Sequence, residues 1–488
     1  MIAAGIARMA IAALMPLFPD ETYYWEWSRR LAAGYFDHPP MIAWLVRAGT
    51  LLAGDTPLGV RLFPVVTGFV AGLFLMATAR RLSGARAVLL TAIIFAVMPL
   101  SAAGLILATP DAPLLTAASA TFYYVVRALQ SPPRSRASLR WWCVAGIGLG
   151  LALLSKYTAV LVPLGIVIGL LSVRELRTRL TEPGPYVATL IALLLFSPVI
   201  MWNAGHDWLS FAFQLQHGLG GAGGSVFRRE LDFIGGQIGL VSPILLVMMI
   251  VAIYRAFRLP RPSSLLAIVS IFIFAFFMYS ATRRRVEANW PALAYLPALL
   301  LLATHASRRK WDRWLGAGIV LASLLTIVTY VNAFVPILPV PARRDPTARA
   351  AGWNDLARAV NRTYSQRLPI SSYRTHLAAD RYQEASELAF HLPDHPETYA
   401  LNLTTRANNY DLWPTFVDRA LPRDAMILVV DEVLGEHPTV ALLTPHFTTV
   451  RQGDQAVLAR GGDPVKHLRI WMLDGWHGTW PQRSLRSR

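Results

Sequence analysis

Long runs of apolar residues recur from the first residue to about residue 335 and then stop. A membrane-spanning helix needs roughly 20 predominantly apolar residues, and eleven stretches are candidates. They lie at 1–18, 59–79, 87–107, 112–130, 142–154, 157–173, 185–202, 237–254, 264–281, 291–306 and 314–336. Beyond residue 340, short β-rich runs at 425–431 and 467–473 and a helical pattern at 379–392 replace them. The pattern predicts a polytopic α-helical membrane domain over 1–339 and a soluble α/β domain over 340–488.

Composition supports the membrane prediction and indicates how the net positive charge should be interpreted. The chain is 54% hydrophobic and 15% charged, with a mean hydropathy of +0.42, whereas a soluble domain carries about 25% charged residues. The formal net charge is +17, but most basic residues lie in short loops between apolar runs, where they signal topology and contact anionic headgroups. We therefore expect membrane lipids, and no nucleic acid, as partners. A single cysteine, Cys143, excludes an intramolecular disulfide and a cysteine-based metal site.

Basic loops set the predicted orientation. They lie at 80–86, 134–140, 174–179, 255–261 and 308–313. All five fall on the cytoplasmic side if the N-terminus is cytoplasmic and the stretch 142–173 is two spans that meet at Ser155–Lys156. We interpret residues 1–18 as a retained first span rather than a cleaved leader. The sequence thus predicts a multi-pass protein of the bacterial inner membrane with residues 340–488 in the periplasm.

The first loop on the opposite side, residues 19–58, carries two acidic clusters beside the membrane. Asp20 and Glu21 follow the first span, and Asp37 and His38 follow a Gly-Tyr-Phe segment. An interfacial amphipathic helix with an aromatic belt would explain the tryptophans and arginines of this loop. It does not explain the carboxylates, because they gain nothing from anionic lipid.

Two further polar residues interrupt apolar sequence on the same side. Asp111 lies between two prolines, and ionisable residues at membrane depth are usually functional; the alternative is a helix N-cap. Lys156, one of three lysines among 46 basic residues, lies between two short spans. Its ammonium can meet a phosphate as a point charge, or it can snorkel to the interface.

The last loop on this side contains Arg283, Arg284 and Arg285, which break the charge rule and suggest a local anionic partner or a headgroup anchor. Carboxylates and cations on one face suit the transfer of a sugar from a lipid phosphate. A carboxylate accepts the proton of the acceptor hydroxyl. The cations, with or without a divalent metal, stabilise charge on the leaving phosphate.

The segments PDE, FDHPP, TPDAPL, LLSKYTA and EANWPALAYLP resemble, in this order over residues 15–300, the GT-C superfamily of membrane glycosyltransferases. The relevant branch holds the aminoarabinose lipid A transferases and the protein O-mannosyltransferase-like enzymes. The resemblance implies the GT-C fold with about eleven spans and a C-terminal periplasmic α/β domain. It also implies that Asp20 is the catalytic base or an acid-anchoring carboxylate, that Glu21 supports it, and that Asp111 is the second-loop acid of the catalytic set.

The resemblance implies a donor-phosphate site as well. Asp37 and His38 match a segment that approaches the donor phosphate or a metal, and His38 stands where the aminoarabinose transferases have lysine. Lys156, Arg284 and Arg285 are the cations that can compensate for it. Trp290 lies near a tyrosine position that approaches the phosphate, and its indole N–H can donate. A divalent metal, Mg²⁺, Mn²⁺ or Zn²⁺, would draw on Asp20, Asp37 and Asp111.

The expected function is that of an inverting glycosyltransferase that moves a sugar from a polyprenyl-phosphate donor to lipid A, lipopolysaccharide core or another envelope glycan. A protein O-glycosyltransferase is the nearest alternative. A transporter or flippase for lipid-linked sugars is a different class, which predicts charges at mid-bilayer and two related halves; neither is found in the sequence. The C-terminal domain is expected to be an accessory lid, an acceptor-docking domain or simply a packed structural domain.

Overall fold

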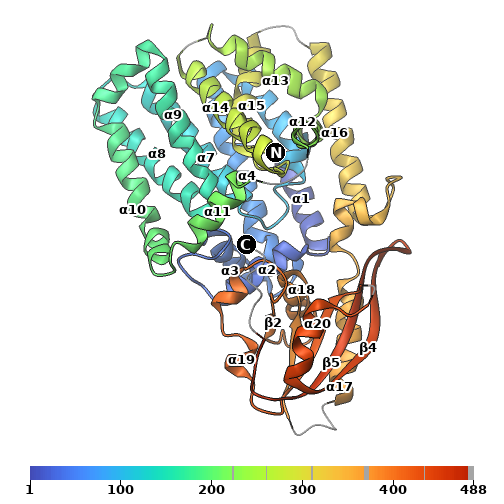
Figure 1. Ribbon diagram of the computed structural model, residues 1–488. Coiled ribbons are helices and arrows are strands. Elements are labelled where there is room, and N and C mark those ends of the chain that lie inside the picture. The colour runs from blue at the N-terminus through green and yellow to red at the C-terminus, as the bar shows by residue number, and fades with distance from the viewer. Residues whose placement is uncertain (222–224, 260, 309–311, 368–372, 434, 482–488) are drawn as a thin grey trace. The chain divides into compact units, whose positions relative to one another are not determined.

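The computed structural model describes residues 1–221, 225–259, 261–308, 312–367, 373–433 and 435–481 (Figure 1). These residues form two compact units. The helical unit comprises Met1–Leu14 and Leu31–Tyr330, and the sheet unit comprises Met15–Arg30 and Val331–Arg488. Residues 15–30 therefore pack with the C-terminal part of the chain rather than with the spans. The sequence-based domain limits, 1–339 and 340–488, stay a prediction.

The helical unit is built almost entirely from apolar helices. Its helices are α1 Ile2–Leu14, α3 Met41–Ala53, α4 Pro57–Ser83, α5 Ala85–Val97, α6 Pro99–Ala102, α7 Asp111–Gln130, α8 Arg136–Ser155, η1 Tyr157–Val160, α9 Leu161–Ser172, η2 Arg174–Thr181, α10 Gly184–Ala204, α11 Leu209–Leu219, α12 Val226–Val241, α13 Pro243–Ala256, α14 Arg261–Arg283, α15 Ala292–Arg308 and α16 Asp312–Phe334, the last of which ends in the sheet unit. Among the described residues, five helices are long and apolar enough to cross a membrane: α4, α8, α10, α14 and α16. If each of three pairs of consecutive helices with a sharp bend between them also counts as one span, the number rises to eight. The chain is a multi-pass membrane protein, and the number of eleven spans stays a prediction.

Each of the eleven predicted stretches overlaps a helix, but two helices end earlier than hydropathy suggests. The helix of the stretch 87–107 is interrupted after Val97, because Met98 precedes a proline and adopts extended dihedral angles, and only the short helix α6 follows at Pro99–Ala102. The stretch 237–254 is broken at Ser242, where φ is 83° and Pro243 follows; α12 and α13 meet there at 98°. Apolar composition cannot show either break. Residues 309–311 of the predicted basic loop at 308–313 lie outside the described residues.

Small residues bring α7, α8 and α10 close together (Figure 1). A Cβ on Gly146 or Gly150 of α8 would meet Ala188 or Leu195 of α10, and one on Gly148 would meet Thr121 of α7. In lipid, such close approach by small residues is a main source of helix association. Because a short connection joins α7 to α8, the start of α7 and the end of α8 lie at the same end of the pair.

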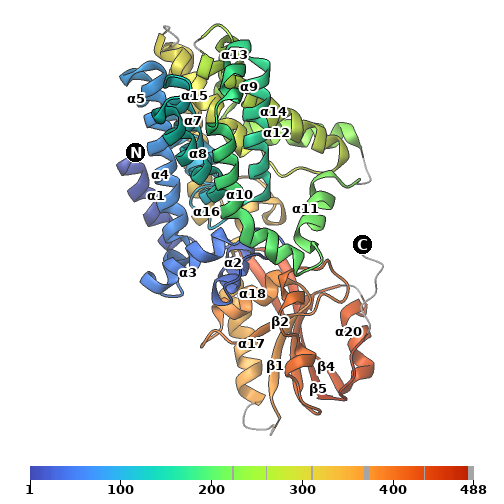
Figure 2. The ribbon, with the colours of Figure 1, turned by 90° about the vertical axis from the view of Figure 1, so that its left-hand side faces the viewer.

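The sheet unit is a mixed α/β domain, as the sequence predicts. Its five strands, β1 Thr375–Ala379, β2 Thr398–Ala400, β3 Ala425–Asp431, β4 Phe447–Arg460 and β5 Asp463–Trp476, are ordered β2-β1-β3-β5-β4. Strands β1, β2 and β3 are parallel, whereas β5 is antiparallel to β3 and β4. Helices α17 Trp353–Arg367 and α18 Tyr382–His391 lie on one side of the sheet and α20 Pro438–Leu443 on the other (Figure 2). Helix α2 Pro19–Arg29 packs against α18.

A buried polar network joins the end of α16 to the sheet. The Asp345 carboxylate lies 2.8 Å from the Arg460 guanidinium of β4 and accepts a hydrogen bond from the Asn332 amide at 2.8 Å. The side chains of Asp345 and Arg460 are 5% and 7% exposed. A buried charge needs such a partner, because desolvation is costly. The network therefore joins the C-terminal end of α16 to β4 within the sheet unit.

We predict that Asp345→Ala destabilises the protein by about 3–5 kcal/mol, because it leaves the Arg460 guanidinium buried and unpaired. The apparent melting temperature of the purified protein in detergent is the measurement. Asp355→Ala is the matched control, because it removes an ion pair whose side chains are 69% and 61% exposed and should cost under about 1 kcal/mol. Equal losses in the two variants would show that the Asp345 network does not hold the unit together.

Candidate active site

In the helical unit, three chain breaks that the sequence singles out meet at one carboxylate. Asp111 accepts a hydrogen bond from the Lys156 ammonium at 2.8 Å on one oxygen. On the other oxygen it accepts one from the Asn289 amide at 2.7 Å. The side chains of Asp111 and Lys156 are 11% and 10% exposed. The motifs TPDAPL, LLSKYTA and EANWP are thus one structural feature, although 45 and 178 residues separate Asp111 from its two partners.

Local backbone structure explains why these side chains occur at chain breaks. Lys156 has extended dihedral angles that end α8, and Asp111 is the first residue of α7, directly after Pro110. The N-cap interpretation of Asp111 is wrong, because Pro110 occupies that position and both carboxylate oxygens bind side chains. Snorkelling of Lys156 is also wrong, because its ammonium is buried and ion-paired. Their buried ion pair makes both residues stronger functional candidates than the sequence alone could.

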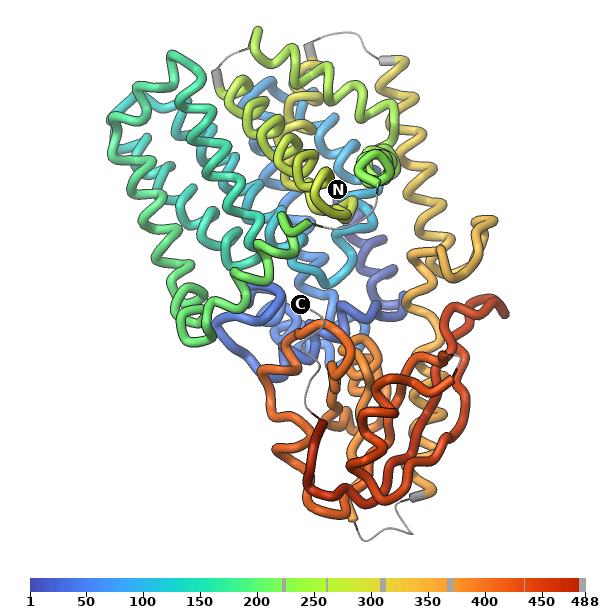
Figure 3. Tube along the Cα trace, viewed as in Figure 1, coloured from blue at the N-terminus to red at the C-terminus, as the bar shows by residue number. Residues whose placement is uncertain are grey.

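Helix α11, the green part of the tube at residues 209–219 in Figure 3, contacts several segments that hold other sequence-predicted residues of this unit. The Gln214 amide donates to the backbone carbonyl of Asp37 at 2.6 Å, and the Tyr157 and Ser210 hydroxyls are 2.8 Å apart. The His217 ring lies 5.3 Å from the Trp290 ring. One short helix therefore contacts the FDHPP segment, the residue after Lys156 and the EANWP segment.

The remaining predicted phosphate ligands of this unit lie around that helix rather than in the carboxylate cluster. The hydrogen bonds and ion pairs of Asp111, Lys156 and Asn289 do not include Asp37, His38, Arg284, Arg285 or Trp290. Arg284 donates to the backbone carbonyl of Gln216 at 2.5 Å. Arg285 lies 3.8 Å from Glu287, and both side chains are more than half exposed. Arg285 is thus open to solvent or headgroups, whereas Arg284 holds the end of α11.

The predicted catalytic acids Asp20 and Glu21 belong to the sheet unit, in the first turn of α2. Asp20 is half-buried and accepts a hydrogen bond from the Tyr382 hydroxyl at 3.1 Å on Oδ1; within the described residues its Oδ2 has no protein partner. Glu21 is 1% exposed, and its carboxylate accepts the Phe18 backbone N–H at 3.0 Å. Asp20 therefore has one carboxylate oxygen without a protein partner among the described residues, and Glu21 caps the helix that carries Asp20.

A second buried carboxyl lies beside this helix. Glu387 of α18 is 1% exposed, and the His391 ring nitrogen lies 3.1 Å away. Burial, opposed by His391 and reinforced by the negative charge of Glu21, raises the pKa of Glu387 to about 7. Glu387 therefore holds its proton to near-neutral pH.

The residues described do not form a metal site of the predicted kind. Among them, no group of three or more His, Cys, Asp or Glu side chains is placed to hold a metal ion. Of the set Asp20, Asp37 and Asp111, the last already uses both carboxylate oxygens on Lys156 and Asn289. A divalent metal therefore stays a prediction, and we derive no step through one.

Sequence analysis missed several residues that the structure brings to these sites. Asn289 stands directly before Trp290 in a segment that the resemblance identifies, and a polar residue at the start of an apolar run was its signal. Tyr382 and Glu387 lie in the amphipathic segment RYQEASELAFHLP, but nothing in that segment shows that it packs on α2. Gln214 and His217 carry no recognisable pattern in the sequence.

We predict a strong energetic coupling between Lys156 and Asp111. Lys156→Met or Asp111→Asn alone should cost about 3–5 kcal/mol, because each disrupts a buried ion pair. The double variant should lose less than the sum of the two. Apparent melting temperatures in detergent measure this cycle, with Arg285→Gln as an exposed control near zero. Strict additivity would contradict the coupling.

We also predict that Glu387→Gln stabilises the protein at alkaline pH. The ordinary pKa of this group is 4.5 and its folded pKa is about 7, so the folded state binds more protons between these values. Its contribution to stability is complete below pH 4.5 and is lost as pH rises through 7. The variant should therefore gain up to about 3 kcal/mol over the parent at pH 8 and little at pH 4.5. Melting curves at both pH values test this, with exposed Glu436→Gln as control.

Comparisons with known proteins agree with this structure. Residues 37–202 match the dolichyl-phosphate-mannose-protein mannosyltransferase family. The lipid A galacturonosyltransferase RgtD of Rhizobium johnstonii is 29% identical over 65% of this chain and 66% of its own length. The lipopolysaccharide core galacturonosyltransferase RgtB of the same organism is 29% identical over 38% of this chain and 36% of its own. The alignments thus span less than two thirds of either relative.

A solved structure extends the likeness to the whole fold. ArnT from Cupriavidus metallidurans in the apo state superposes with a TM-score of 0.63 and 19% identity, covering 96% of both chains. Its structure bound to undecaprenyl phosphate gives a TM-score of 0.62 at 18% identity, over 96% of this chain and 97% of that one. The named relatives are glycosyltransferases, so the transporter alternative is not supported. The five motif segments in matching order, the fold and these relatives together support the assignment of this chain as a membrane glycosyltransferase of the GT-C superfamily.

Proposed function

We propose that this protein moves a sugar, with inversion, from a polyprenyl-phosphate donor to lipid A or lipopolysaccharide core on the periplasmic face of the bacterial inner membrane. The observation that carries the proposal is the buried Asp111–Lys156–Asn289 cluster, which joins three of the superfamily segments. The likeness to a lipid A galacturonosyltransferase and to the fold of a protein solved with undecaprenyl phosphate supports it. The predicted topology, with residues 340–488 in the periplasm, is consistent with an acceptor on that face.

The reaction needs one base and a cationic environment for the leaving group. The acceptor hydroxyl attacks the anomeric carbon, the bond from that carbon to the donor phosphate oxygen breaks, and the proton of the hydroxyl passes to Asp20. One displacement inverts the anomeric configuration. The leaving phosphate is a weak base and departs without a general acid.

Lys156 is the strongest candidate for the phosphate contact. An ammonium has three N–H donors, and within the described residues only Asp111 accepts from this one. Asp111 orients Lys156 in this proposal, so it acts as a positioning residue. His38, Arg284, Arg285 and Trp290 are proposed to line the path of the donor headgroup, with α11 holding their segments. A divalent metal at Asp20 and Asp37 stays outside this mechanism.

We predict that Asp20→Asn abolishes transfer and leaves the protein folded in the membrane. Loss of a positioned base costs about 10²–10⁴-fold in rate, and asparagine can still accept the Tyr382 hydroxyl. The measurement is mass spectrometry of lipid A, core glycan and polyprenyl-phosphate pools in a deletion strain that carries each variant. A glycan should lose one sugar while the lipid-linked form of that sugar accumulates. Because both curated relatives transfer galacturonic acid, a uronic acid is the first sugar to look for.

The exposed Asp454→Asn variant of the sheet unit is the control and should restore the glycan fully. Turnover by Asp20→Asn near the parent level would remove Asp20 from the role of base. An unchanged glycan profile in the deletion strain would contradict the proposed acceptor.

The match of residues 37–202 to a protein mannosyltransferase family favours a second candidate, transfer to a protein hydroxyl. The same deletion strain distinguishes the two. Loss of O-linked glycopeptides from envelope proteins, with intact lipid A and core, would establish the second candidate and overturn the first.

A further inference from the structure

The sheet unit contains a cavity of about 310 Å³ to which neither the reaction nor the family resemblance assigns a role. It lies where the end of α17, strand β1, the segment that enters β2 and the short helix α19 Phe416–Arg419 come together. Its lining includes Tyr364, Arg374, His376, Glu397, Tyr399 and Arg419. The volume is at the lower end of small-molecule sites, enough for one sugar ring and a substituent.

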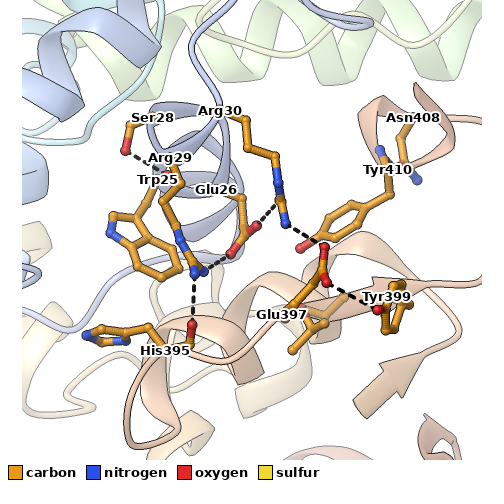
Figure 4. A network of polar contacts seen from close by, with 12 residues as sticks. Trp25, Glu26, Ser28, Arg29, Arg30, His395, Glu397, Tyr399, Asn408 and Tyr410 are labelled. Carbon is orange, nitrogen blue, oxygen red and sulfur yellow. Dashed lines mark hydrogen bonds and ion pairs between the residues drawn. The ribbon is translucent and has the colours of Figure 1, made fainter. Parts of the chain in front are cut away.

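Cations outnumber carboxylates in this lining. The guanidinium of Arg374 has no protein partner within the described residues. Arg419 lies 3.8 Å from Glu397. Glu397 is also 3.3 Å from Arg30 and accepts a hydrogen bond from the Tyr399 hydroxyl (Figure 4). Three charged or polar groups thus share the single carboxylate, and an anionic group can enter the cavity without meeting an uncompensated negative charge.

A histidine on the cavity wall is held in a fixed orientation. The His376 Nε2 lies 3.0 Å from the Asp424 carboxylate, whose side chain is 3% exposed. Asp424 also accepts the backbone N–H groups of Arg374 and Leu421. The His376 ring packs edge-on against Phe416, with centroids 5.1 Å apart. With Nε2 committed to Asp424, Nδ1 is the ring nitrogen left for a ligand.

Aromatic rings add flat apolar surfaces at and beside the cavity, next to its cationic groups. The Tyr399 ring is 5.8 Å from His376 and 6.2 Å from Phe416. Burial, then the neighbouring Glu397, raises the pKa of Tyr399, so its hydroxyl stays protonated and remains a donor. Flat rings beside guanidinium groups suit a saccharide that carries an anionic substituent, because the rings pack against C–H faces while the cations pair with the anion.

The cavity is connected to the helix that carries Asp20. Arg30, the residue that ends α2, reaches both Glu397 at the cavity and Glu26 in the helix, the latter at 2.6 Å (Figure 4). Arg29 also binds Glu26 and donates to the His395 carbonyl at 2.8 Å. From Pro19 to Arg29, α2 rises about 15 Å. An occupant of the cavity would therefore contact the network at one end of the helix whose other end presents the proposed base.

We propose that this cavity binds an anionic sugar of the acceptor glycan, a phosphorylated or carboxylated monosaccharide unit, and so sets acceptor specificity. The proposal rests on the proposed function for the identity of the glycan, but not for the binding chemistry. Arg374 and Arg419 pair with the anion, His376 donates or accepts at Nδ1, and Tyr399 packs against the ring. The C-terminal unit is then an acceptor-docking domain.

Binding is tested first, on the full chain in detergent, by isothermal titration with glucosamine 1-phosphate, glucosamine and inorganic phosphate. We expect saturable binding of glucosamine 1-phosphate and weaker binding of the other two. Arg374→Gln and Arg419→Gln, both at exposed positions that tolerate substitution, should each weaken it about tenfold, the usual cost of one charge-assisted hydrogen bond. Arg451→Gln, an exposed arginine paired with Asp474 on the sheet, is the control.

Two binding results would overturn the inference: no saturable binding of glucosamine 1-phosphate, or equal affinity in the parent and both arginine variants. Equal affinity for inorganic phosphate and glucosamine 1-phosphate would overturn the saccharide part, because the site would then recognise a free anion.

Transfer assays separate this inference from the proposed function. With the acceptor identified by the deletion strain, the arginine variants should raise KM for the acceptor about tenfold and leave kcat and the KM for the donor unchanged. Unchanged acceptor KM would overturn the docking role while the glycosyltransferase function stands. Arginine-dependent binding of glucosamine 1-phosphate in a protein whose deletion alters no glycan would contradict the proposed function and leave the cavity as a sugar-phosphate site.

Discussion

The ion pair between Asp111 and Lys156 is the interaction on which the helical unit depends. Each charge alone would be costly among apolar helices, and each lies where a helix begins or ends. Their contact, with Asn289 on the second carboxylate oxygen, fixes α7, α8 and the segment before α15 relative to one another. The close packing of glycines on α8 makes the contact possible, because it brings the helix ends within reach.

In the sheet unit, too, buried carboxylates are paired with arginines. Glu26 is buried and held by Arg29 and Arg30, and Asp345 is held by Arg460. These pairs join α2 and the end of α16 to the domain that follows the spans. The first polar segment of the chain and the C-terminal domain therefore form one folded unit, and the base proposed at Asp20 is positioned by residues more than 350 positions away, such as Tyr382.

Much of the architecture could be predicted because hydropathy is a local property. A helix in lipid must satisfy its own backbone, so each long apolar run predicts a helix, and strand β3 coincides with the predicted run 425–431. The helix ends at Val97 and Val241 were missed because a proline or a residue with positive φ, rather than composition, decides them. The carboxylates and Lys156 were found since charges within apolar sequence stand out. Tyr382 and Glu387 were not, because polar residues in polar segments carry no such contrast, and Asn289 was missed although it stands at the start of an apolar run.

By itself, the sequence determined that this chain is a multi-pass membrane protein with an α/β C-terminal part, and which ionisable residues interrupt the apolar sequence. These features can be predicted because periodicity, hydropathy and motif order depend on residues that are close together in the sequence. Only the tertiary structure decided that Lys156 pairs with Asp111, that residues 15–30 pack on α18, and that a cationic cavity lies beside β1. Each of these depends on contacts between segments tens to hundreds of residues apart, and no local pattern encodes which distant partner a buried charge will meet.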